Sequence, residues 1–497
     1  MMSGAQPVAG PHSAMIFAVP ALYFGIHVVV RTLVSDSLQV DEAEQILMAR
    51  DWRLGYGSQP PLYTWLQRAF FRVFGPGVFA LALLKNLLLW GVFALIHQAA
   101  RRVFADRLAP VLAAGSLVLF PGLMWESQRD QTHLVLATCL SAALLLSWLR
   151  LWQSPTPGAY ALLGAVAGLG VLAKYNYAVL LAALLGTAVA TRATRPLVLR
   201  PRMLIAVGVF LMVTGAHAWW CLRHPDIALA QTHKFKLAAG GWLGALAMGL
   251  REFFLCVLAY AGPPLALVGI LFAGARPAAG PAAGSDRPEL RFLGRTMLAG
   301  LGLSLAGILA FQVTSVKARW FQPLFMFLPL VLAAWMAPRV TPARIRALGL
   351  LITAALITVP VILYGRVTHV AWSERPTNLN HPYGAWAAEL RRAGFTEGWI
   401  LTPNLGLGGN LQYQIPGATV GTPELSPGHP PPGAKVLVAW RPAGRNGAMT
   451  NAFDFCERLT GRRPDPASAR GIEAPMVHHP ANRVALGYAI LDPLSAP

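Results

Sequence analysis

Long apolar runs recur along the first 366 residues of this 497-residue chain, and they constrain its fold more than any other feature. Each run is about 17 to 25 residues long, the length that an α-helix needs to cross about 30 Å of hydrocarbon. Only 12% of the residues are charged, which is too few for an ordinary soluble protein. The runs predict helical spans at 14–34, 77–97, 108–124, 133–152, 158–173, 175–191, 203–222, 252–273, 295–313, 322–337 and 347–366.

Eleven spans make the chain an α-helical polytopic membrane protein. The count stays open around Lys174, where two short apolar stretches form either two helices or one span. After residue 366 the pattern changes to short alternating units. It predicts a polar helix at Tyr383–Arg392, a turn at the Gly-rich LGLGGN stretch and a strand at KVLVAW. We therefore divide the chain into a transmembrane domain, 1–366, and a small extracytoplasmic α/β domain, 367–497.

Basic residues predict the orientation in the membrane. Arginine clusters at 101–107, 192–202, 276–295 and 339–346 fall on one side of an eleven-span chain, and that side is expected to be the cytoplasm. The N-terminus is then cytoplasmic and the C-terminal domain periplasmic, at a bacterial inner membrane. The loops near 35–76, 125–132, 223–251 and 314–321 face outward. An anionic substrate on that face would explain their basic residues, so the net charge of +20 does not indicate nucleic acid.

The first outer loop carries an unusual group of acids. Asp41, Glu42 and Glu44 lie within four residues, and their mutual repulsion should raise the pKa of at least one unless a cation neutralises it. The structural alternative is a solvated helix start, with Asp41 as the cap and Glu44 three residues later. A divalent cation on Glu42 or Glu44 stays open, since oxygen ligands suit such a metal but no His/carboxylate spacing requires it. Gln59 and Tyr63 flank a rigid proline pair that would hold this loop against the membrane.

Further charged residues occupy the other outer loops and the break at Lys174. Arg129 precedes Asp130 in the second loop, and Lys317 and Arg319 precede a late apolar span. A single Lys or Arg at a helix end is more often an interfacial anchor than a ligand. Three basic clusters facing two acidic ones on the same side nevertheless favour binding of an anionic substrate.

Five stretches resemble, in this order, the motifs of the membrane-embedded GT-C glycosyltransferases. They are VDEAEQ, WRLGYGSQPPLYTWL, RDQTHLVL, GLGVLAKYNYAVLL and VKARWFQPLFMFLPLVLA. More narrowly, they are similar to the family 39-like group, which includes protein O-mannosyltransferases, aminoarabinose transferases of lipid A and galacturonosyltransferases of the lipopolysaccharide core. The resemblance extends from Val40 to Leu332. Many relatives carry Lys or His where this chain has Gln59, so that position brings no charge here.

The resemblance implies an inverting glycosyltransferase that moves a sugar from a polyprenyl-phosphate donor to a glycolipid or protein acceptor. The enzyme would also contact the membrane lipids around it. The acidic motifs of the family fall on Asp41-Glu42 and on Asp130. Asp41 is therefore the expected general base, with Asp130 sharing the catalytic site. The basic residues would bind the departing phosphate. The residues expected to contact the substrate are Glu42, Glu44, Gln59, Tyr63, Arg129, Lys174, Lys317 and Arg319.

Two other classes of protein remain as alternatives. A transporter or flippase of a lipid-linked intermediate should carry charged residues in the middle of its spans and broken helices in two matching halves, and neither is evident. A structural or assembly subunit would not need clustered acids. The identity of the sugar and of the acceptor depends on pocket shape, which the sequence does not give.

Overall fold

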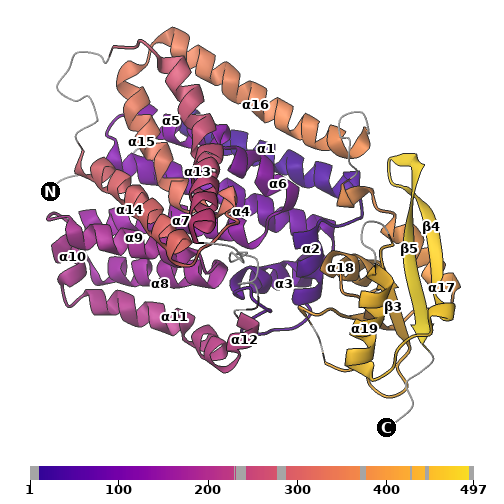
Figure 1. Ribbon diagram of the computed structural model, residues 1–497. Helices are drawn as coiled ribbons and strands as arrows, with labels where there is room; N and C mark the ends of the chain where they lie inside the picture. Colours follow the sequence, from indigo (N-terminus) through magenta and orange to yellow (C-terminus); the bar gives the residue numbers. More distant parts are fainter. Residues whose placement is uncertain are drawn as a thin grey trace.

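The computed structural model describes residues 11–228, 230, 242–276, 287–369, 377–425, 428–442 and 447–491, without the side chains of 11–16. A bundle of helices forms one part of the molecule and a sheet flanked by helices forms the other (Figure 1). The helices of the bundle are α1 (Pro11–Val34), α2 (Val40–Met48), α3 (Leu62–Phe74), α4 (Val78–Val103), α5 (Leu108–Ser116), α6 (Ser127–Asp130), α7 (His133–Gln153), α8 (Pro157–Ala173), α9 (Tyr177–Ala190), α10 (Arg195–Leu199), α11 (Met203–Arg223), α12 (Pro225–Ala228), α13 (Trp242–Phe272), α14 (Pro288–Ala310), α15 (Leu328–Met336) and α16 (Pro342–Thr368).

The bundle confirms that the chain is a multi-pass membrane protein. Among the described residues, seven helices are long and apolar enough to cross a bilayer, and a pair bent by 63° at 108–119 and 122–130 forms an eighth candidate. Three shorter apolar helices lie at Pro157–Ala173, Tyr177–Ala190 and Leu324–Arg339. Each of the eleven predicted segments falls on one of these helices. The helices α13 and α14 begin earlier than their apolar windows, at Trp242 and Pro288.

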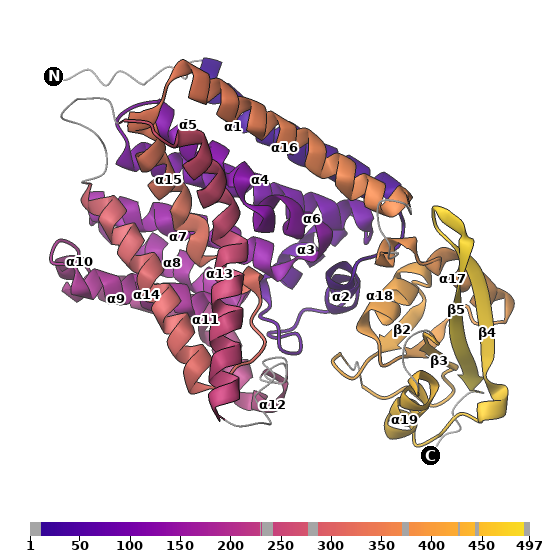
Figure 2. The ribbon, with the colours of Figure 1, turned by 45° about the horizontal axis from the view of Figure 1, so that its top comes forward.

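The outside of the bundle is apolar and its inside is closely packed. The helices α1 and α16 lie side by side along one edge of the molecule (Figure 2), and their outward side chains, such as Leu33 and Leu350, are more than 70% exposed. Such a surface suits lipid. Inside, α8 packs so tightly on α11 that a Cβ on Gly164 would lie 2.2 Å from the Ala206 carbonyl oxygen. Small residues on α8 therefore serve packing within one chain.

The C-terminal residues form a five-stranded sheet of order β2-β1-β3-β5-β4. The pairs β1/β2 and β1/β3 are parallel, while β3/β5 and β4/β5 are antiparallel. The predicted polar helix and the predicted KVLVAW strand are both confirmed. The elements are α17 (Tyr383–Arg392), β1 (Gly398–Leu401), α18 (Leu405–Gln414), β2 (Ala418–Gly421), β3 (Val436–Trp440), α19 (Ala448–Thr460), β4 (Arg470–Met476) and β5 (His479–Leu491).

The prediction of a turn at LGLGGN is wrong, because this stretch is the first part of α18. The side chain of Asn404 caps the helix by accepting a hydrogen bond from the Leu407 amide at 2.8 Å. Its glycines allow α18 to approach α2, since a Cβ on Gly409 would lie 2.2 Å from the Ala43 carbonyl oxygen. Close packing between two helices, rather than a turn, thus explains these glycines.

The contact between α18 and α2 joins the two parts of the molecule. The Asn410 side chain accepts a hydrogen bond from the Leu38 amide at 2.7 Å and donates one to the Leu38 carbonyl at 3.1 Å. Just beyond α2, Arg50 donates to the Gln412 side chain at 3.0 Å. The C-terminal sheet and its helices are therefore fixed to α2, the helix that carries the first group of acids.

Candidate active site

A cavity of about 1940 Å³ lies where α2, the breaks between helices and the C-terminal part meet. Its lining includes many apolar residues of α9, α11 and α14 together with charged and polar residues from the loops and helix ends. Six of the residues predicted to act on substrate line it. These are Asp41, Glu44, Gln59, Lys174, Lys317 and Arg319.

Asp41 lies in the first turn of α2, outside the membrane-spanning helices, and is only partly exposed. Its amide donates a hydrogen bond to Oδ1 of Asp130, at the end of α6, at 2.9 Å. A carboxylate that accepts from a free amide at a helix start interacts favourably with the helix dipole. Asp130 thus fixes the start of α2. The two predicted catalytic acids therefore lie next to each other, although only Asp41 lines the cavity.

Glu42 points away from the cavity into a buried cluster of charge. Arg31 of α1 donates to both carboxylate oxygens, at 3.1 and 2.6 Å, and Lys85 Nζ of α4 lies 3.7 Å from Oε1. All three side chains are buried or nearly so, with exposed fractions of 12%, 3% and 1% for Arg31, Lys85 and Glu42. The Gln39 amide also donates to Glu42, at 3.0 Å. Glu42 thus links α2 to the helices α1 and α4.

The start of α2 differs from the predicted cap. Gln39 occupies the N-cap position and the residue three positions later is Glu42. The prediction that Asp41 caps the helix with Glu44 as its partner is therefore wrong by two positions. The helix start is also not solvated, because Glu42 and Glu44 are buried. Both carboxylates are held in a protein environment.

The environment separates the pKa values of the two neighbouring acids Asp41 and Glu42. Burial raises the pKa of Asp41 above its usual range, although Lys174, Arg319 and Lys85 act in the opposite direction. Burial also acts to raise the pKa of Glu42, but Arg31 and Lys85 outweigh it and hold that pKa at about 2. Glu42 is thus charged at any ordinary pH, whereas Asp41 is a carboxylate able to take up a proton.

The basic side of the cavity is assembled from two breaks in the bundle. Lys174 lies between α8 and α9, and Arg319 lies in a short 3₁₀ turn before α15. The Asn176 side chain donates to the Trp320 carbonyl at 3.1 Å and so joins the two breaks. Lys174 and Arg319 are also the cations with the largest influence on the Asp41 carboxylate. Two cations and a proton acceptor therefore share one end of the cavity.

A stacked network closes the wall beside Lys174. His217 of α11 donates through Nδ1 to the Leu54 carbonyl at 2.6 Å and accepts from the Tyr175 hydroxyl at 3.1 Å. Trp220 stacks on the His217 ring, and it also covers Gly55, where a Cβ would lie 2.3 Å from the Trp220 ring. His217 is therefore a satisfied structural histidine that joins α11 to the loop before Gln59.

Other predicted contact residues lie outside the cavity lining. Tyr63 is fully buried against His133, with ring centroids 5.4 Å apart. Arg129 pairs at 3.1 Å with the partly exposed Glu126. The part of the predicted loop 223–251 that includes 229 and 231–241 lies outside the described residues. Within the described part of the chain, no group of three or more His, Cys, Asp or Glu side chains forms a metal cluster.

Arg31, Lys85 and Glu424 were not predicted from the sequence. Arg31 and Lys85 neutralise Glu42, and Glu424 is an acidic residue of the C-terminal part that lines the cavity. A signal did exist for Lys85, which is a charged residue inside the apolar α4 and so needs a buried partner. The prediction that no span carries a charge in its middle is wrong at this residue. No sequence pattern marks Glu424.

The chain is similar to known proteins both in its sequence and in its fold. Residues 58–220 match the model of a family described as dolichyl-phosphate-mannose-protein mannosyltransferase. The structure is similar to a crystal structure of ArnT from Cupriavidus metallidurans bound to undecaprenyl phosphate. The TM-score is 0.60 at 16% identity, over 97% of this chain and 98% of that one.

Two curated relatives come from Rhizobium johnstonii. The lipopolysaccharide core galacturonosyltransferase RgtB is 34% identical over 413 residues, which is 82% of either chain. The lipopolysaccharide core galacturonosyltransferase RgtA is 30% identical over 431 residues, or 85% of either chain. The chain belongs to the family of membrane-embedded glycosyltransferases that these enzymes represent, and it is an enzyme rather than a transporter.

Proposed function

We propose that this enzyme transfers galacturonic acid, with inversion, from a polyprenyl-phosphate carrier to a sugar hydroxyl of lipopolysaccharide on the periplasmic face of the inner membrane. The observation that carries the proposal is one cavity lined by Asp41, by the two cations that act on its charge, Lys174 and Arg319, and by many apolar side chains. The names of the curated relatives support galacturonic acid as the sugar and lipopolysaccharide as the acceptor.

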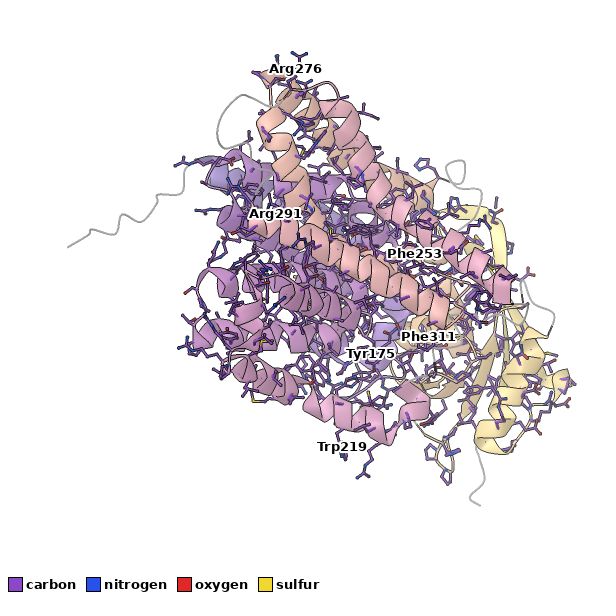
Figure 3. The ribbon with its side chains drawn as sticks, turned by 60° about the vertical axis from the view of Figure 1, so that its left-hand side comes forward. Tyr175, Trp219, Phe253, Arg276, Arg291 and Phe311 are labelled. Atoms are coloured by element: carbon purple, nitrogen blue, oxygen red, sulfur yellow. The ribbon has the colours of Figure 1, made fainter. Side chains whose placement is uncertain are left out.

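The apolar wall suits the polyprenyl chain of the donor. Leu211 and Leu222 of α11 and Phe311 after α14 line the cavity, yet their exposed fractions are 58%, 81% and 72%. These side chains are therefore apolar and accessible at the cavity, and we infer that the lipid enters between α11 and α14, the helices that carry or precede them. Figure 3 shows Phe311 at the end of α14, and Tyr175, which it also labels, lines the same cavity.

The cations suit a donor that carries two negative groups. A sugar phosphodiester has one negative charge, which increases on phosphate as the glycosidic bond breaks, and Lys174 and Arg319 would offset it. Lys317 lines the same cavity as a third cation. A hexuronic acid brings a second anion, its carboxylate, and Lys317 is the residue that we assign to it.

The reaction needs one proton acceptor and one leaving group. The acceptor hydroxyl attacks the anomeric carbon, the bond from that carbon to the phosphate oxygen breaks, and polyprenyl phosphate leaves with the electron pair. Asp41 takes the hydroxyl proton, and its raised pKa suits a general base. Asp130 positions Asp41 through the amide at the start of α2. Charge is conserved, because the proton lost by the acceptor ends on Asp41 while the leaving phosphate gains one negative charge.

The membrane arrangement supports a periplasmic site. We infer eleven crossings, a cytoplasmic N-terminus and a division into domains at 366/367. Arg276 follows the end of α13 and Arg291 lies in the first turn of α14, whereas Phe311 follows the last turn of α14 (Figure 3). Arginines mark the cytoplasmic ends of spans. Reporter fusions after Arg276 and after Leu491 should give cytoplasmic and periplasmic signals, and the reverse pattern would contradict this topology.

The decisive experiment compares Asp41→Asn with wild type and with a strain that lacks the gene, by mass spectrometry of envelope glycolipids. We expect the mass of one hexuronic acid to be missing in both the deletion and the Asp41→Asn strain. Asp51→Asn is the matched control, because Asp51 is an exposed acid just beyond α2 that pairs with the exposed Arg53. Wild-type glycolipids in the Asp41→Asn strain would refute Asp41 as the base.

A further inference from the structure

Two tight turns, one from each part of the molecule, meet at the edge of the cavity. In the first, Tyr56 and Gln59 exchange backbone hydrogen bonds of 3.2 and 3.0 Å, and Gly57 between them has a φ of +57°. In the second, Thr422 and Leu425 exchange backbone hydrogen bonds of 3.2 Å in each direction. A Cβ on Gly57 would lie 3.3 Å from the Glu424 carbonyl oxygen. The two turns are therefore in contact.

The second turn brings the C-terminal domain into the cavity wall. Glu424 lines the cavity together with Leu405, the first residue of α18. On the side of the bundle, the first turn contributes Ser58 and Gln59. A carboxylate, a hydroxyl and an amide are the groups that bind sugar hydroxyls through hydrogen bonds. We call Ser58, Gln59 and Glu424 the rim of the cavity. Its chemistry differs from that of the apolar wall and from that of the cationic end.

The rim is also held at a fixed position relative to Asp41. The domain that carries Glu424 packs on α2 through Gly409, where the two helix backbones are in contact. Asn410 binds both backbone groups of Leu38, just before α2 begins. Because the same domain supports the helix of the base, an acceptor bound at the rim would have a defined position relative to Asp41.

We propose that the turn 422–425 forms the acceptor-binding wall of the active site, and that Glu424 accepts hydrogen bonds from the hydroxyls of a glycan acceptor. The inference rests on the proposed function and makes it more specific. The acceptor is then a polyhydroxylated sugar chain that enters at the mouth between the two domains, whereas the lipid-linked donor enters between α11 and α14. Each substrate has its own entrance, and the two meet at Asp41.

The test uses the full-length enzyme in lipid nanodiscs, with Glu424→Gln and Glu424→Ala. The donor is polyprenyl-phosphate galacturonic acid, and the acceptor is core oligosaccharide from the deletion strain. Loss of hydrogen bonds to a charged group should raise the KM for the acceptor by about tenfold or more. The KM for the donor should stay within about twofold, since no donor contact is removed. Glu473→Gln, at an exposed site on β4, is the matched control and should change neither value.

The outcomes separate the two proposals. An unchanged acceptor KM in Glu424→Ala, or an increase in the donor KM alone, would overturn the assignment of the turn 422–425 as the acceptor wall. Failure of the wild-type enzyme to transfer galacturonic acid would instead overturn the proposed function. Because Glu424 is exposed on a turn, the variants should fold, and thermal unfolding of each variant checks this.

Discussion

The buried carboxylate of Glu42 should stabilise the folded protein, and replacing it with glutamine tests this. Arg31 and Lys85 hold the pKa of Glu42 at about 2, against 4.5 for the free side chain. At about 1.4 kcal/mol for each tenfold change in proton affinity, this difference corresponds to about 3 kcal/mol of stability at neutral pH. Removing one partner of a buried ion pair costs about 3–5 kcal/mol, because the other charges stay buried without compensation.

The assay is thermal unfolding of Glu42→Gln in nanodiscs at pH 7, where we expect a decrease of several degrees. A carboxylate with a lowered pKa stabilises the folded state above its unfolded pKa, and this contribution is lost as the pH falls toward the folded pKa. The difference between variant and wild type should therefore be full above about pH 5 and should shrink toward pH 2. Glu389→Gln removes an ion pair with Arg392 at the surface and should change stability by less than about 1 kcal/mol.

The result also decides between two roles for Glu42. If Glu42 contacts the substrate, as the family motif suggested, Glu42→Gln should raise a KM and leave the unfolding temperature unchanged. That outcome would refute the role of Glu42 in balancing buried charge. If Glu42 does balance buried charge, adding Lys85→Met to Glu42→Gln should recover part of the lost stability, because one uncompensated cation is removed.

Three further predictions concern the cavity and its supports. In the pH profile of kcat, the decrease at acid pH should have a midpoint above the usual pKa range of an aspartate, because burial raises the pKa of Asp41. Lys174→Met should move this midpoint to higher pH, because Lys174 lowers the pKa of Asp41. An unshifted midpoint in the variant would argue against an interaction between these two charges. Gly409→Ala must move α18 from α2 by about 1 Å and should lower kcat roughly 100-fold in a folded protein, whereas Gly471→Ala, where a Cβ meets nothing within 4 Å, should behave as wild type. Lys317→Gln should lower kcat/KM by about tenfold for a galacturonosyl donor and less for a galactosyl donor, and equal losses would refute its assignment to the carboxylate.

The positions of the apolar helices could be predicted from the sequence, because a helix that crosses a bilayer needs a long run of apolar residues. A prediction of this kind needs only local information. The turn predicted at LGLGGN failed because glycine was judged by its local preference. In the folded protein, Gly409 allows contact between α18 and α2, and those helices are separated by more than 350 residues along the chain. Packing between distant segments outweighed the local preference.

The same distinction applies to the site. Acids that lie near one another in the sequence, such as Asp41 and Glu42, could be identified from their spacing and from the resemblance to a family. Their partners could not, because Arg31 and Lys85 lie on two different spans and meet Glu42 only in the folded bundle. Glu424 is more remote still, since it reaches the cavity through the contact of the C-terminal sheet and its helices with the bundle.

The pairing of Asp41 with Glu42 shows how adjacent carboxylates can take different roles. If Glu42 faced the cavity as a bare anion, its charge would add to that of Asp41 and repel the phosphate of the donor. Arg31 and Lys85 cancel that charge within the protein, so Glu42 can fix α2 without opposing substrate binding. Asp41 keeps a raised pKa at the cavity, where a base must gain a proton. The side chain that is always charged thus supports the helix, and the one that can be protonated faces the substrate.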